Sequence, residues 1–152
     1  MVSRVYHALK AMFLDFINDA IRGKLTVEAQ KRFLIIGGII GLLGVAIGAV
    51  GTHGLSDLLE AHGRAGTFDT AVHYHQIHAL MLVLVAILHG KTSSHSAMTR
   101  AGYFFLAGIF LFSGSLYILA IFDIGIMGAI APLGGTSLIL GWGSIAWGAY
   151  KS

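Results

Sequence analysis

The amino-acid sequence predicts an all-α integral membrane protein, in which an amphipathic helix precedes an antiparallel bundle of four transmembrane helices. Hydrophobic residues make up 56% of the 152 residues and charged residues only 11%, whereas about a quarter of the residues in a soluble domain are charged. The apolar residues gather in four stretches, each close to the roughly 20 residues that a helix needs to cross a bilayer. There is no cysteine, which excludes disulfides and thiolate metal sites.

Residues 1–32 are expected to form an amphipathic helix and a linker, separate from a transmembrane domain at residues 33–152. Apolar side chains recur at helical spacing, and the charged side chains fall largely on other faces. Gly23 is the predicted end of this helix. Such a helix lies on a membrane surface or against a partner protein. The apolar positions are Val5, Leu9, Met12, Phe13, Phe16, Ile17 and Ile21.

The first span is expected at residues 33–50, where glycines follow one face at intervals of three and four. In lipid, helices associate through close van der Waals contact, and small residues let two backbones approach. We therefore expect this face to pack on another helix, of the same chain or of another subunit. Its glycines are Gly37, Gly41, Gly44 and Gly48.

The remaining spans are expected at residues 71–89, 101–122 and 127–150. A short interfacial helix around Leu55–Leu59 connects the first two spans, and Asp123 and Gly125 indicate a tight turn between the last two. Pro132 falls in the first turns of the last span, where a missing backbone donor is least harmful. A second close-packing stripe recurs every seven residues, and aromatic rings near the end of the span are typical interfacial anchors. The stripe is Gly134, Gly141 and Gly148, and the anchors are Trp142, Trp147 and Tyr150.

The basic residues predict the orientation. With four spans, nine of the ten Lys and Arg residues lie on the side of both termini, and only Arg64 lies on the other side. The positive-inside rule then places both termini in the cytoplasm, or in the matrix of a mitochondrion. The basic residues beside apolar spans are explained by this orientation, so nucleic acid is not an expected partner.

Histidines near the outer ends of the first two spans are candidates for a metal site. His53, His75 and His78 carry imidazoles that suit zinc, copper or iron, with Asp57 or Asp69 as a carboxylate. Axial ligation of haem is a second possibility. The alternative is that these rings form hydrogen bonds between helices. The spacing matches no closed metal motif, and no catalytic residue can be nominated.

Four segments of the chain form a recognisable set: GAVGTHGL from Gly48, TFDTAVHYHQIHALML from Thr67, LFSGSLYILA from Leu111 and APLGGTSLILGW from Ala131. Together and in this order they resemble the transmembrane protein 256 family, also known as the domain of unknown function 423 or the YgdD/YwdK-like proteins. The resemblance implies a small four-span protein of the bacterial inner membrane or of mitochondria, without an established activity. It also implies a glutamine at the position of His75. The family positions it marks include His53, Tyr74, His78, Ser113, Ser115, Tyr117, Pro132 and Trp142.

Two main hypotheses for the function follow. The first is a non-enzymatic accessory or assembly subunit of a larger membrane complex, such as a respiratory one, with lipid and other membrane subunits as partners. The second is a redox protein that binds a transition metal or haem through the outer histidines. A small transporter is a third class, although four helices with few charges offer no evident aqueous path.

Overall fold

The computed structural model describes residues 2–151, with the side chains from residue 21 onward and those of residues 7, 10–12, 14, 15, 17 and 18. The chain forms α1 (Val2–Gly54), α2 (Ser56–Ala61), α3 (Ala65–His89), α4 (His95–Gly108), the π-helix η1 (Ile109–Ser113), α5 (Gly114–Phe122) and α6 (Met127–Tyr150). Four segments within this range are long and apolar enough to cross a membrane: Ile21–Gly54, Ala65–His89, His95–Phe122 and Met127–Tyr150. The predicted all-α bundle of four transmembrane helices is confirmed.

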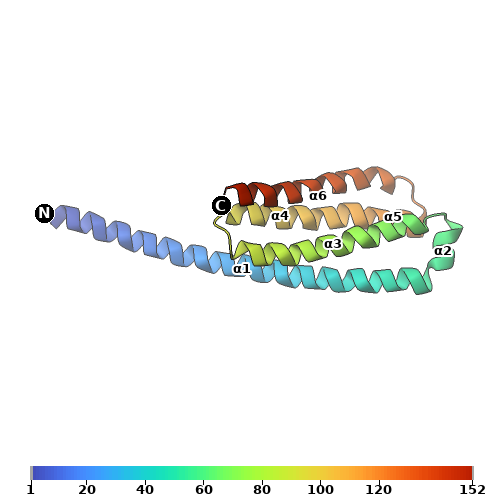
Figure 1. The fold of residues 1–152 in the computed structure, drawn as a ribbon, viewed down its shortest axis with the longest axis horizontal. Helices are drawn as coiled ribbons and strands as arrows, with labels where there is room; N and C mark the ends of the chain where they lie inside the picture. Colours follow the sequence, from blue (N-terminus) through green and yellow to red (C-terminus); the bar gives the residue numbers. More distant parts are fainter. Residues whose placement is uncertain (1, 152) are drawn as a thin grey trace.

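The bundle consists of two closely packed antiparallel pairs (Figure 1). α1 packs mainly on α3, and α4 packs mainly on α6, while α3 joins the two pairs through α4, η1 and α5. Large fully buried side chains at this junction include Leu82, Val85 and Phe105. The apolar side chains of α1 that face away from the bundle, such as Leu34, Ile39 and Leu42, are exposed and suit contact with lipid.

The glycine faces are used inside the chain. Along α1, Gly37 faces Val83, Gly44 faces the ring of His75 and Gly48 faces Val72, so this stripe lies against α3. Along α6, Gly134 lies against the backbone of η1, Gly141 against Phe105 and Gly148 against Met98. Gly41 lies near Ala79, where the contact is looser. Both stripes therefore pack within one protomer.

The first helix differs from the expectation. α1 is a single helix of 53 residues, so the predicted end at Gly23 is wrong. A lone glycine costs a helix only about 1 kcal/mol relative to alanine, and the neighbouring residues outweigh that cost. The first part of α1 projects beyond the bundle, on the side where the carboxyl terminus lies (Figure 1). The domain division at residue 32 stays a prediction, and the side chains of Val5, Leu9, Phe13 and Phe16 lie outside the described residues.

The other helix ends follow the sequence in part, and α4 begins at His95, six residues before the expected start of its span at residue 101. α6 has the predicted bounds, and a short helix, α2, connects the first two spans. α3 begins at Ala65, six residues before the expected start of its span, because the polar residues before Ala71 are also helical. Asp123 adopts a left-handed conformation with φ of 51° and ends α5. This is the tight turn that Asp123 and Gly125 predict.

Candidate functional site

His78 ties α3 to α6 inside the bundle. The residue is 4% exposed, and its Nδ1 lies 2.7 Å from the carbonyl oxygen of Tyr74. Because a carbonyl only accepts, Nδ1 carries the hydrogen and Nε2 presents a lone pair. The indole N–H of Trp142 donates to that lone pair over 3.3 Å. Both nitrogens of a neutral ring are thereby satisfied, and the ring of Tyr74 stacks on His78 with centroids 5.8 Å apart.

His75, one turn earlier, ties α3 to α1 and α5. Its Nε2 donates to the carbonyl oxygen of Ile40 over 2.9 Å, so its Nδ1 accepts from the hydroxyl of Tyr117 over 3.2 Å. A β-carbon at Gly44 would lie 3.2 Å from the His75 ring. Because Gly44 has no side chain, the His75 ring packs closely on α1 while it donates to the carbonyl of Ile40, one turn earlier in that helix.

A π-helical turn lies opposite the two histidines. η1 interrupts the third span at Ile109–Ser113, and π-turns of this kind are frequent at functional sites. Gly134 of α6 packs directly on its backbone. The hydroxyl of Ser113 is buried without a hydrogen-bond partner among the described residues, whereas Ser115 donates to the carbonyl of Phe112.

An apolar cavity of about 180 Å³ lies between α1, α3 and the π-helical region. Ile40, Ile109 and Phe110 contribute to its walls, and His75 and Tyr117 are the polar residues that reach it. The pair of rings is thus accessible from an apolar space inside the spans. Chemically, the site provides neutral hydrogen-bonding groups in an apolar setting, and it holds no charged side chain.

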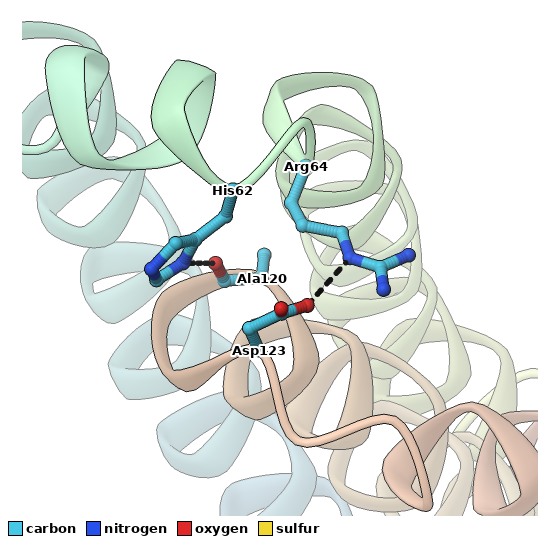
Figure 2. A network of polar contacts seen from close by, with 4 residues as sticks. All are labelled: His62, Arg64, Ala120 and Asp123. Carbon is cyan, nitrogen blue, oxygen red and sulfur yellow. Dashed lines mark hydrogen bonds and ion pairs between the residues drawn. The ribbon is translucent and has the colours of Figure 1, made fainter.

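A second group of polar contacts lies at the end of the bundle opposite the two termini (Figure 2). Arg64 donates from Nε to Asp123 over 3.0 Å, and His62 donates from Nδ1 to the carbonyl oxygen of Ala120 over 3.1 Å. Both contacts join the turn before α3 to the end of α5. Arg64 is the basic residue that the sequence isolates on this side, and here it holds the turn that Asp123 forms.

The ion pair itself is expected to add little stability. The side chains of Arg64 and Asp123 are 37% and 49% exposed, so Arg64→Ala should lower the free energy of unfolding by only about 0.5 kcal/mol. Asp123→Ala should cost more, roughly 1–2 kcal/mol, because alanine is disfavoured in the left-handed conformation. Equilibrium unfolding in detergent micelles measures both values. A larger loss for Arg64→Ala than for Asp123→Ala would contradict this prediction.

Comparison with known proteins places the chain in a family. The model of a protein family of unknown function, DUF423, matches residues 47–135. The chain belongs to the DUF423 family. The UPF0382 membrane protein YwdK of Bacillus subtilis is 46% identical over 122 residues, which cover 80% of this chain and 98% of YwdK. A UPF0382 membrane protein of Haemophilus influenzae is 35% identical over 123 residues, covering 81% of this chain and 97% of that protein. No solved structure matches.

The family resemblance seen in the sequence is therefore confirmed, and the four apolar spans of this DUF423 protein agree with the description of its relatives as membrane proteins. The family model covers His75, His78 and Tyr117, and it ends before Trp142. The match to YwdK leaves about 30 residues of this chain outside it. The first part of α1 also lies outside the family model.

The structure brings together some of the positions that the resemblance marks and leaves others apart. Tyr74, His78 and Trp142 form one contact group, and Tyr117 pairs with His75. Ser113 lies in η1 and Ser115 follows it in α5, whereas Pro132 lies inside α6 and His53 is exposed in the last turn of α1. The sequence interpretation of Trp142 as an interfacial anchor missed its bond to His78.

In the structure, the side chains of the predicted metal ligands do not point toward a common site. His53 is exposed, and His75 and His78 each use both ring nitrogens in hydrogen bonds. No group of three or more His, Asp or Glu residues able to hold an ion occurs among the described residues, and Asp57 and Asp69 are exposed. The donor set therefore does not fit a metal or haem without breaking these bonds. A metal or haem site on His53, His75 and His78 stays a prediction.

Proposed function

We propose that this DUF423 protein is a non-enzymatic accessory or assembly subunit of a larger complex in the bacterial inner membrane, with both termini on the cytoplasmic side. One observation carries the proposal. The arm, defined as residues 2–21 of α1, continues beyond the bundle as helix and projects alone from it (Figure 1). It supplies a docking surface that the close-packed bundle lacks.

The geometry supports a partner protein for the arm. The segment Ile21–Gly54 has 34 residues and is about 50 Å long, which exceeds the roughly 30 Å hydrocarbon core. The arm therefore stands outside the core, on the side rich in Lys and Arg. Leu14, Ile17 and Ile21 are exposed there at intervals of three and four, which places them on one face. A helix that runs in line with a span cannot lie flat on the same membrane, so another protein is the simpler cover for this face.

The bundle itself is not the docking surface that we propose. Its glycine stripes are already packed against α3 and α4–η1, so they are not the docking surface. Many of its exposed side chains in the spans are large and apolar, as expected for contact with lipid. Recognition by a specific partner is therefore assigned to the arm.

The proposal predicts that substitutions on the arm abolish comigration with a larger complex. The full-length protein is extracted from its native membrane in mild detergent, and everything that migrates with it on a native gel is identified by mass spectrometry. The variant L14Q/I17Q/I21Q keeps an arm that can still form a helix but lacks the apolar face. This full-length variant should migrate on the native gel without partner proteins. The control variant D15N/N18Q changes exposed polar residues on the arm and should retain the complex. A wild-type protein that migrates alone, or equal behaviour of the two variants, would rule the proposal out.

A further inference from the structure

A cavity of about 540 Å³ opens where α1 leaves the bundle, between α1 and the connection from α3 to α4. Arg22 and Thr26 line it from α1, and His89, His95 and Thr99 line it from the other helices. The cavity lies at the end of the bundle that carries both termini, away from His75, His78 and the apolar cavity beside them. It also lies beside the bundle and not on the arm, so it is separate from the proposed docking surface.

His89, which is one of the residues that line this cavity, holds a buried and unpaired hydrogen-bond acceptor. The hydroxyl of Thr99 donates to the carbonyl oxygen of His95 over 3.0 Å, so its oxygen accepts from Nε2 of His89 over 2.9 Å. Nδ1 of His89 is then a lone pair. The residue is 3% exposed, and no described group hydrogen bonds that atom. A buried acceptor without a donor costs roughly 1–3 kcal/mol, so this atom favours a ligand that brings a hydrogen-bond donor.

His95 adds a second acceptor. Its Nδ1 lies 2.8 Å from the carbonyl oxygen of His89 and must donate to it, which leaves a lone pair on Nε2. The centroids of the two rings are 5.2 Å apart. Two neighbouring imidazole rings, each with one acceptor nitrogen, are therefore among the groups that line the cavity.

The opposite wall favours an anion. Arg22 is exposed on α1, and this positively charged residue lines the cavity. His95 and Ser96, in the first turn of α4, also line it, and amide groups in the first turn of a helix favour negative charge. A free metal cation would suit the imidazoles but would be repelled by Arg22. A simple anion would suit Arg22 but would leave the lone pair of His89 unpaired. A ligand that joins both chemistries satisfies both walls.

We propose that this cavity binds the headgroup of a membrane phospholipid in which a phosphate is joined to a hydrogen-bond donor, as in the ammonium of ethanolamine or the hydroxyls of glycerol. The phosphate contacts Arg22 and the first turn of α4, and the donor contacts His89 and His95. The depth of the cavity supports a lipid as the source of this chemistry. α3 has 25 residues and ends at His89, so it is about 37 Å long, and its end reaches the headgroup region of the bilayer.

The test is lipid binding to the purified full-length protein, measured by native mass spectrometry. Dioleoyl phosphatidylethanolamine, phosphatidylglycerol and phosphatidylcholine share their chains and the phosphate, but choline carries no hydrogen-bond donor. The first two lipids are expected to bind about tenfold more tightly than phosphatidylcholine, the worth of one charge-assisted hydrogen bond. Equal affinities for the three lipids would overturn the proposal.

Two matched variants locate the binding. Arg22→Gln should weaken binding of phosphatidylethanolamine about tenfold, whereas Lys24→Gln should leave it unchanged, because Lys24 is exposed on α1 and does not line the cavity. Both residues are exposed, so neither change threatens the fold. Equal effects of the two variants would overturn the assignment to this cavity.

Competition experiments distinguish a membrane lipid from a soluble molecule that carries the same phosphate and hydrogen-bond donor. Glycerophosphoethanolamine, the soluble headgroup, should displace the lipid only at much higher concentration, since it lacks the chains. Displacement by inorganic phosphate at the concentration of the lipid would show a free anion as the ligand and would overturn the proposal. Zinc binding that Arg22→Gln strengthens would show a two-histidine metal site instead and would also overturn it.

Discussion

Gly134→Ala is expected to lower the free energy of unfolding by about 3 kcal/mol. A β-carbon at this position would collide with the backbone of Leu111 and Phe112, in the π-helical turn of the third span. Backbone atoms cannot rotate away as a side chain can, so α6 must separate from η1 or the π-turn must change. The loss would be measured by equilibrium unfolding in mixed detergent micelles, followed by the fluorescence of the two tryptophans.

Gly135→Ala provides the control in the same helix turn. A β-carbon at Gly135 would lie 3.8 Å from the ring of Phe112, which is an ordinary van der Waals contact. This change should be close to neutral or slightly stabilising, because alanine is a better helix former than glycine by roughly 1 kcal/mol. If both substitutions cost the same, close approach of α6 to η1 is not what Gly134 provides.

His75→Phe is expected to cost about 2 kcal/mol of unfolding free energy. The substitution keeps an aromatic ring near Gly44 but removes the donor to the Ile40 carbonyl and the acceptor for the Tyr117 hydroxyl. The hydroxyl of Tyr117 would then lie in an apolar space without its partner. His73→Phe is the matched control, because His73 lies two residues away on α3 and is exposed, and it should cost far less.

A double-mutant cycle isolates the bond between the two rings. Tyr117→Phe alone leaves Nδ1 of His75 unpaired, and His75→Phe alone leaves the Tyr117 hydroxyl unpaired. The double variant H75F/Y117F removes both polar groups, so it should cost clearly less than the sum of the single changes, by roughly 0.5–1.5 kcal/mol. Additive losses would mean that the hydrogen bond between His75 and Tyr117 contributes nothing to stability.

The spans themselves were predictable because hydropathy is a local property. Twenty or so apolar residues must be helical in lipid, since an unpaired backbone group there costs several kcal/mol. The last span, Met127–Tyr150, was therefore predicted with its observed ends. The start of α3 was missed by six residues, because hydropathy predicts where a helix enters the core and not where the helix itself begins.

Gly23 shows a limit of reading helix ends from residue type. Glycine is frequent just after a helix because it tolerates a positive φ, but this permissiveness does not oblige a helix to stop. Gly63, with φ of 65°, does use that freedom in the turn between α2 and α3. The same residue type thus takes opposite roles, and only the path of the neighbouring chain distinguishes them.

For the histidines, too, the sequence predicts the position along the helix but not the partner of each ring. The sequence indicates that His53, His75 and His78 lie near the ends of two neighbouring spans, which made a shared site a reasonable hypothesis. Helix rotation decides where each ring points, and it directs His75 to Ile40 and Tyr117, and His78 to Tyr74 and Trp142. Trp142 is 64 residues from His78 in the chain, so no local pattern in the sequence could have paired them.

The sequence was enough to predict that the protein spans a membrane, how many spans it has, their order and the two glycine faces. Each of these features depends on the composition and spacing of residues within one helix. The tertiary structure alone decided which helix covers each glycine face, which partners satisfy the buried imidazoles and that α1 continues as the arm. These features depend on the relative rotation and depth of helices distant in the chain. In lipid, small residues and a few hydrogen bonds determine that rotation, and their partners become known only when the helices are packed.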